Sequence, residues 1–217
     1  MSEINVIKRD GRKEPLDLSK FHKVTTWACE GITGVSPSQI ELKSHIQFFN
    51  NMKTSEIQET LIKAAADLIT DETPNYQFVA GRLINYHIRK EVYGEINPPH
   101  IYEHIKKCID KGFYTEELLD WYTEDEWNQI DNMIDHSRDT DIAYAGMEQF
   151  RGKYLVKNRV THEFCETPQM AYALIAATFF HAYENGTRMK WVKKCYDAIS
   201  TFDLSLPTPI VTGKHDS

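Results

Sequence analysis

The sequence predicts a mainly α-helical protein in two parts, and three observations lead to that prediction. Apolar residues recur at helical spacing along most of the chain, strand-like patterns are short, and Pro98-Pro99 interrupts an extended stretch between the two halves. We expect a β-hairpin plus four-helix bundle at residues 1–94. A helical domain with a small hairpin should follow at residues 95–203. Residues 204–217 should form a single strand and a C-terminal tail.

Composition and charge exclude several classes of protein. The 217 residues are 41% hydrophobic and 26% charged, which is ordinary for a globular protein. A net charge of −7 argues against a nonspecific nucleic-acid binder. The longest apolar run, residues 170–180, is about half of the ~20 residues that a membrane span needs. With no secretory signal at the start, we expect a cytoplasmic protein without nucleic-acid or membrane partners.

The first predicted element is a hairpin. Residues 4–9 indicate a strand, and Asp10-Gly11 is a dipeptide favoured by a two-residue type I′ turn. The return strand, residues 12–16, contains Pro15. Because proline cannot donate to a β-ladder, this strand should lie at an edge.

The first two helices are predicted from their caps. Ser19 should cap the first, which Gly31 ends. Ser36 should cap the second, with Pro37 as its first helical residue and Gln39 completing a capping box. The expected buried stripe of the second helix is Leu42, Ile46 and Phe49.

The next two helices have clearer apolar faces. Thr54 should cap the third helix, and Thr73-Pro74 should open the fourth. The expected buried residues are Ile57, Leu61, Ala65 and Leu68 in the third helix, and Tyr76, Val79, Leu83 and His87 in the fourth.

The second half is also predicted to be helical. Helices are expected near residues 101–111, 115–122, 124–135, 140–152, 167–184 and 187–200. Thr123 and Glu126 form a capping box. Residues 154–156 and 160–164 flank a polar turn and suggest a small hairpin, while Pro207 and Pro209 favour an extended end.

Few residues point to chemistry by pattern alone. Lys8 and Arg9 before the tight turn, with Lys20 opening a helix, could hold a phosphate, although basic residues in a surface hairpin are usually only solvated. His162 with Cys165 has no second pair at metal-ligand spacing, so we expect no metal site.

Two further groups of polar residues favour structural roles. Asp135, His136 and Asp139 are more typical of a hydrogen-bond network at a helix end than of acid–base catalysis. The four cysteines show no CxxC spacing and are expected to be reduced, packed thiols: Cys29, Cys108, Cys165 and Cys195.

A series of motifs along the chain resembles a known family. In order, they are VIKRDG at 6–11, KTSEI at 53–57, IKAAADLI at 62–69, NYQFVAGRL at 75–83, RGKYLV at 151–156, ETPQ at 166–169, AISTF at 198–202 and SLPTPI at 205–210. The first four resemble an ATP-cone. Together they resemble the N-terminal part of the large (α) subunit of class Ia ribonucleoside-diphosphate reductases of the bacterial or phage type.

The resemblance implies a fold and an activity. Large subunits of this family begin with the cone, an allosteric site for ATP or dATP, followed by a helical segment and an α/β barrel whose first strand would include residues 205–210. They reduce ribonucleoside diphosphates by radical chemistry for deoxyribonucleotide synthesis. The radical comes from a small subunit with a di-iron centre, so this chain itself is expected to bind no metal.

The resemblance also implies site residues. Lys8, Lys20 and Lys90 would hold phosphates, Glu14 and Asp17 would accept hydrogen bonds from the adenine amino group, and Thr54 would offer its hydroxyl. Thr208 would contact the substrate. The full set expected at the nucleotide is Lys8, Arg9, Glu14, Pro15, Leu16, Asp17, Leu18, Ser19, Lys20, Thr54, Gln58 and Lys90.

Three departures from the family pattern matter. Gln58 stands where a well-studied branch has histidine, and Asp17 where it has asparagine, so inhibition by dATP is expected to be weak. After Ile210 the sequence diverges from the family pattern and does not continue to the family's catalytic cysteine.

Because the catalytic cysteine is missing, we expect this chain to be inactive alone and to need a complementary C-terminal polypeptide. The alternatives are a stand-alone regulatory nucleotide-binding module and a truncated fragment without function.

Overall fold

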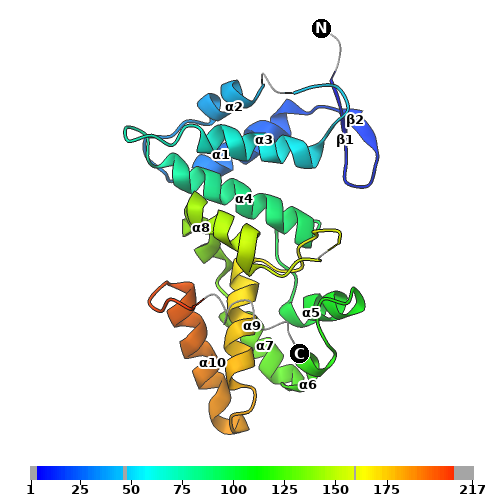
Figure 1. The fold of residues 1–217 in the computed structure, drawn as a ribbon, viewed down its shortest axis with the longest axis vertical. Coiled ribbons are helices and arrows are strands. Elements are labelled where there is room, and N and C mark those ends of the chain that lie inside the picture. The colour runs from blue at the N-terminus through cyan, green and yellow to red at the C-terminus, as the bar shows by residue number, and fades with distance from the viewer. Residues whose placement is uncertain (1–3, 46–47, 159, 208–217) are drawn as a thin grey trace. The chain divides into compact units, whose positions relative to one another are not determined.

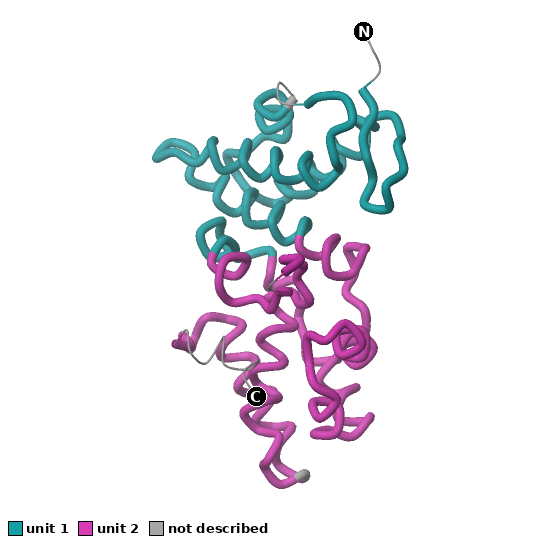
Figure 2. Tube along the Cα trace, turned by 45° about the vertical axis from the view of Figure 1, so that its right-hand side comes forward, with its two compact units in different colours: residues 1–87, 140–148 teal, residues 88–139, 149–217 magenta. Residues whose placement is uncertain are grey.

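The computed structural model describes residues 4–45, 48–158 and 160–207, and it is mainly helical with one small sheet (Figure 1). The chain forms two compact units (Figure 2). Unit 1 comprises residues 1–87 and 140–148, and unit 2 comprises residues 88–139 and 149–217. The three breaks between the units, after residues 87, 139 and 148, all fall within helices. The sequence predicts a boundary after residue 94, which stays a prediction.

The sheet of unit 1 has three short strands in the order β2-β1-β3. β1 (Asn5–Ile7) pairs antiparallel with β2 (Lys13–Pro15) and parallel with β3 (Met52–Lys53). The predicted edge position of the Pro15 strand is confirmed. The parallel pairing places Ile7 opposite Lys53, which brings the start of the third helix to the end of β1.

The predicted type I′ turn is wrong. The Lys8 N–H donates to the Arg12 carbonyl (2.8 Å), so three residues form the loop. Gly11 has a φ of +85°, but Asp10 is not among the residues with positive φ. A three-residue loop needs only one left-handed residue, and glycine supplies it.

Four helices complete the main part of unit 1: α1 (Leu18–Cys29), α2 (Pro37–His45), α3 (Thr54–Ala66) and α4 (Tyr76–Val92). The predicted faces of the last two are confirmed except at Leu68, which is only partly buried. The residues buried there as predicted are Ile57, Leu61 and Ala65 in α3 and Tyr76, Val79, Leu83 and His87 in α4.

Two of the predicted caps are shifted by one or two residues. Asp17, not Ser19, caps α1, and its carboxylate accepts from the Ser19 N–H (2.9 Å). Thr54 is the first residue of α3 rather than its cap, and the Lys53 N–H donates to Glu56 Oε2 (2.8 Å). An acidic side chain therefore satisfies a backbone donor at each of the two N-termini.

The second helix differs most from the prediction. Pro37 is its first residue as expected, but Gln39 Oε1 accepts from the Tyr76 hydroxyl (2.7 Å), and that hydroxyl accepts from the Ser36 N–H. Tyr76 thus replaces the predicted capping box. Leu42 is 73% exposed and Phe49 57% exposed, so the predicted buried stripe is wrong at both; Ile46 lies outside the described residues.

Unit 2 is built from helices packed around one apolar helix. The elements of the second half of the sequence are α5 (Ile101–Asp110), α6 (Glu117–Asp120), α7 (Glu124–Met133), a 3-10 helix (His136–Asp141), α8 (Tyr144–Gln149), a π-helical turn (Phe150–Tyr154), α9 (Pro168–Phe180) and α10 (Asn185–Ser200). Residues 140–148, and with them most of α8, belong to unit 1. α9 is buried continuously from its first residue to Ala177 and packs against α10. A helix that is apolar on every side forms a core, as here.

Other expectations for the second half have mixed outcomes. The Thr123–Glu126 capping box is confirmed, with the Thr123 N–H donating to Glu126 Oε2 (2.9 Å). The small hairpin is reduced to a single bridge between Lys157 and Phe164. The predicted helix at residues 140–152 is divided among three short elements. Residues 208–210 of the predicted final strand lie outside the described residues. Within the described ranges, no helix is long and apolar enough to cross a membrane.

One glycine of α4 is required by close packing within unit 1. A Cβ at Gly81 would lie 2.1 Å from the backbone carbonyl oxygen of Ile142. We predict that Gly81→Ala lowers the free energy of unfolding by roughly 1–3 kcal/mol, because backbone must shift to admit the methyl group. Gly186→Ala, with nothing near the added Cβ, is the matched control for thermal melting. Equal melting of the Gly81 variant and the wild type would contradict the prediction.

Candidate nucleotide-binding site

The first site residues that the structure brings together are two lysines and a glutamate. Lys8, directly after β1, places its Nζ 2.7 Å from Glu14 Oε1 on β2. Lys20, in the first turn of α1, lies 3.8 Å from the same oxygen. One carboxylate therefore faces two ammonium groups, which lower its pKa, chiefly through the hydrogen bond from Lys8.

Asp17 adds a second carboxylate to this group. Its Oδ2 lies 3.8 Å from Lys20 Nζ, while Oδ1 accepts from the Ser19 hydroxyl (2.6 Å) and N–H. These hydrogen bonds from Ser19 lower the pKa of Asp17. We call Lys8, Glu14, Asp17 and Lys20 the Lys8 cluster. It lies at the N-terminus of α1, where the helix dipole favours an anion.

Thr54 belongs to a second helix N-terminus at the end of the same sheet. Since Ile7 pairs with Lys53 in parallel register, the residues that follow them, Lys8 and Thr54, leave the sheet at the same edge. Gln58 lies one turn further along α3. Its Oε1 is buried and has no hydrogen-bond partner among the described residues.

Arg9 lies within electrostatic reach of Tyr86, an aromatic residue of α4 that no sequence motif indicates. Its positive charge acts on the partly buried Tyr86 hydroxyl, although burial has the larger effect and raises the pKa of that group. The Tyr86 ring packs against Trp27 with centroids 5.9 Å apart. These residues come from the hairpin, α4 and α1, and no local motif links them.

The other predicted site residues have different positions. Pro15 pairs with Asn5 in the sheet, and the Leu16 N–H donates to the Ile4 carbonyl (2.8 Å). Leu18 begins α1 and is 50% exposed. Lys90 lies in the last turn of α4 and belongs to unit 2. Thr208 lies outside the described residues.

The arrangement in unit 1 suits a phosphorylated ligand with a polar base. The ammonium groups of Lys8 and Lys20 and two helix N-termini can bind phosphate oxygens. The Glu14 and Asp17 carboxylates can accept hydrogen bonds from an amino group. An arriving phosphate would compete with Glu14 for the two lysines.

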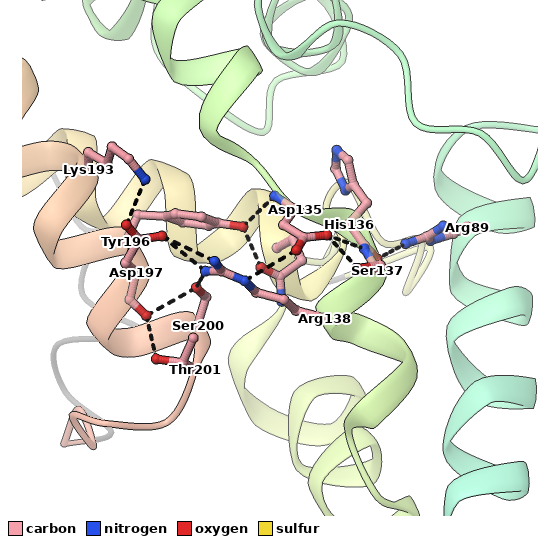
Figure 3. Close-up of polar contacts among 11 residues, drawn as sticks. Arg89, Asp135, His136, Ser137, Arg138, Lys193, Tyr196, Asp197, Ser200 and Thr201 are labelled. Atoms are coloured by element: carbon pink, nitrogen blue, oxygen red, sulfur yellow. Dashed lines mark hydrogen bonds and ion pairs between the residues drawn. The ribbon is translucent and has the colours of Figure 1, made fainter. Parts of the chain in front are cut away.

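The acidic and histidine cluster of unit 2 is a hydrogen-bond network, as the sequence favours (Figure 3). Asp135 Oδ1 accepts from the Ser137 N–H (3.0 Å), and its own N–H donates to the Tyr196 hydroxyl (2.8 Å). The His136 carbonyl accepts from Arg89 Nη2 (2.7 Å), and burial lowers the pKa of the imidazole to about 4. These contacts join the end of α7 to α4 and α10.

His162 is exposed, whereas Cys165 is buried. Across the described part of the chain, no group of three or more histidine, cysteine, aspartate or glutamate side chains is placed to hold a metal ion. Cys165 instead contacts Cys108 and His104 of α5.

Comparison with known proteins gives two matching domain families. The ATP cone domain family matches residues 4–91, and the ribonucleotide reductase all-alpha domain family matches residues 140–213. The chain is 52% identical over 208 residues to ribonucleoside-diphosphate reductase 1 subunit alpha of Escherichia coli, covering 96% of this chain and 27% of the relative.

Two further relatives show similar coverage. The subunit alpha of Haemophilus influenzae is 51% identical over 208 residues, and that of phage T4 is 41% identical over 215 residues; both alignments cover 28% of the relative. The chain thus spans little more than a quarter of the length of these relatives. It carries an ATP cone and the ribonucleotide reductase all-alpha domain, and it belongs with the N-terminal region of bacterial and phage ribonucleoside-diphosphate reductase α subunits.

Proposed function

We propose that residues 4–91 bind ATP or dATP as an allosteric effector at the Lys8 cluster. The observation that supports this most is that Lys8 and Lys20, from separate elements, both lie against Glu14 beside the N-terminus of α1. The match to the ATP cone family covers all of these residues.

Each residue has a proposed role at the nucleotide. Lys8 and Lys20 bind phosphate oxygens, and Arg9 adds positive charge nearby. The family resemblance gives Lys90, on α4, a phosphate-binding role as well. Glu14 and Asp17 accept hydrogen bonds from the adenine amino group. The Thr54 hydroxyl lies at a helix start, where backbone amides add donors. Gln58 Oε1, buried without a partner among the described residues, is an acceptor that a ligand could satisfy.

ATP at millimolar concentration is expected to raise the melting temperature of the chain. A ligand that binds only the folded state adds about 2.7 kcal/mol when present at 100 times its Kd. Lys8→Ala should abolish most of the shift, because it removes the charge nearest to Glu14. Lys13→Ala, an exposed lysine on the same hairpin, is the matched control and should keep it. No shift in the wild type, or an equal shift in the Lys8 variant, would contradict the proposed site.

The chain is proposed to act in deoxyribonucleotide synthesis in the cytoplasm. Its relatives are reductase α subunits, which supports a ribonucleoside diphosphate substrate and a small subunit that carries the di-iron radical centre. Residues 1–217 would work with the catalytic region of a large subunit, supplied as a complementary polypeptide, and Thr208 would contact the substrate.

Reconstitution tests this role and the effect of dATP together. Residues 1–217 with a small subunit should reduce no ribonucleoside diphosphate until a polypeptide carrying the catalytic region is added. In the active mixture dATP should inhibit weakly, because Gln58 and Asp17 change the hydrogen-bonding groups of the cone. The larger effect should come from Gln58, whose Oε1 is buried, since a buried group left without a hydrogen bond costs roughly 1–3 kcal/mol. Activity without the added polypeptide would contradict the first expectation. Near-complete inhibition at micromolar dATP would contradict the second.

A further inference from the structure

Two cysteines and a histidine of unit 2 line one small cavity. The cavity has a volume of about 240 Å³, and its wall includes His104 and Cys108 from α5 and Cys165 from the segment before α9. Lys107 and Lys111 line the same cavity. Cys108 and Cys165, which we call the thiol pair, are each only 3% exposed. They are far apart in sequence, so no spacing rule reveals the pair.

The contacts within this cavity hold the thiol pair together. His104 Nε2 lies 3.4 Å from Cys108 Sγ, one helical turn away, and 2.5 Å from the Cys165 carbonyl oxygen. Cys108 Sγ lies 3.5 Å from that same carbonyl oxygen. The Tyr93 ring packs edge-on against the His104 ring with centroids 4.9 Å apart, which fixes the imidazole.

The two thiols have opposite electrostatic character. A hydrogen bond from the Cys165 thiol, assisted by His104, lowers the pKa of Cys108 to about 6. Burial raises the pKa of Cys165 above its usual range. Of the two thiols, Cys108 is therefore the one that gives up its proton more readily. The thiolate is the nucleophilic form of cysteine, and a reactive thiolate beside a second thiol is typical of oxidation-sensitive sites.

We propose that the thiol pair is a modification site at which hydrogen peroxide converts two free thiols into an intramolecular disulfide. All four cysteines are reduced in the structure. This inference concerns unit 2 and does not depend on nucleotide binding in unit 1.

The proposed reaction has two steps. The Cys108 sulfur attacks one peroxide oxygen and the O–O bond breaks, which gives a sulfenic acid and a hydroxide; the proton that Cys108 gave up converts this hydroxide into the first water molecule. The Cys165 sulfur then attacks the Cys108 sulfur, the S–O bond breaks, and a water molecule leaves with the Cys165 proton. Two electrons pass from the thiol pair to peroxide, and the products are one disulfide and two molecules of water.

Peptide mapping of the full chain after treatment with hydrogen peroxide tests the proposal. The expected result is that the peptides containing Cys108 and Cys165 are linked under non-reducing conditions, while Cys29 and Cys195 remain thiols. Cys195 is the internal control, since it is more exposed than either member of the pair but burial raises its pKa. If exposure alone governed oxidation, Cys195 would react first.

Two variants separate the steps. Cys165→Ser should leave Cys108 as a sulfenic acid that dimedone traps, because the second thiol is absent. His104→Gln should slow the oxidation of Cys108 about tenfold by reducing its thiolate fraction. Two results with the wild-type protein would overturn the proposal, whatever the variants show. One is oxidation of Cys195 or Cys29 before oxidation of the thiol pair, and the other is a thiol pair that stays reduced in excess peroxide.

Discussion

Replacing Arg188 with methionine is expected to lower the free energy of unfolding by about 3–5 kcal/mol, because it leaves a buried carboxylate without its partner. Arg188 on α10 is 6% exposed and Glu126 on α7 is 8% exposed. Arg188 Nε donates to Glu126 Oε1 (2.6 Å), and Nη2 donates to the second carboxylate oxygen. The guanidinium also lies over the Tyr122 ring, 4.6 Å from its centroid.

Chemical denaturation of the variant measures this effect, and two comparisons define its cause. Arg12→Met is the matched control, since the Arg12–Asp10 pair is exposed and such surface pairs contribute little to stability. The double variant Glu126→Gln with Arg188→Met should recover part of the loss, because no unpaired charge remains buried. A loss in Arg188→Met no larger than in Arg12→Met would contradict a strong buried ion pair.

The second large effect is a pH dependence that arises from Asp139. This residue is fully buried, and burial raises the pKa of its carboxyl from an ordinary 3.8 to about 6, even though Arg89 Nη2 lies 3.3 Å away and lowers it. Between these two values the folded state binds a proton that the unfolded state releases. The contribution of Asp139 to stability is therefore present below pH 4 and lost as the pH rises through 6, by roughly 3 kcal/mol in total.

Asp139→Asn isolates this contribution. Asparagine stays neutral, so the variant should gain stability relative to the wild type as the pH rises from 4 to 7. Below pH 4 the wild-type carboxyl is also protonated, so the free energies of unfolding of the two proteins should differ least there. Free energies of unfolding measured across this range check the prediction, and a wild-type-to-variant difference that is independent of pH would refute it.

Local signals in the sequence predicted most helices correctly, and the failures have specific causes. The 3.6-residue pattern identified α4 because Tyr76, Val79 and Leu83 are all buried. The same pattern failed for α2, where Leu42 is exposed and the Tyr76 hydroxyl, from α4, takes the place of a local capping box. That exchange depends on tertiary packing, which local sequence patterns do not contain.

Interactions between distant residues were the least predictable. The charges of Lys8 and Lys20 suggested a phosphate site, but only the folded hairpin shows that Glu14 lies between them. Likewise, spacing gave no reason to associate Cys108 with Cys165, whose contact depends on how α5 packs against the segment before α9. Side chains of this kind come from segments that are distant in sequence, so their burial and their partners can be assigned only from the folded structure.

Equilibrium dialysis of ATP against residues 1–217 tests the central claim most directly, with adenosine as the comparison ligand. The proposed site binds chiefly through phosphates, so ATP should bind saturably while adenosine should not bind at the same concentration. The double variant Lys8→Ala with Lys20→Ala should lose ATP binding, and Lys13→Ala should keep it. Absence of ATP binding at millimolar concentration, or unchanged binding in the double variant, would contradict a nucleotide site at the Lys8 cluster.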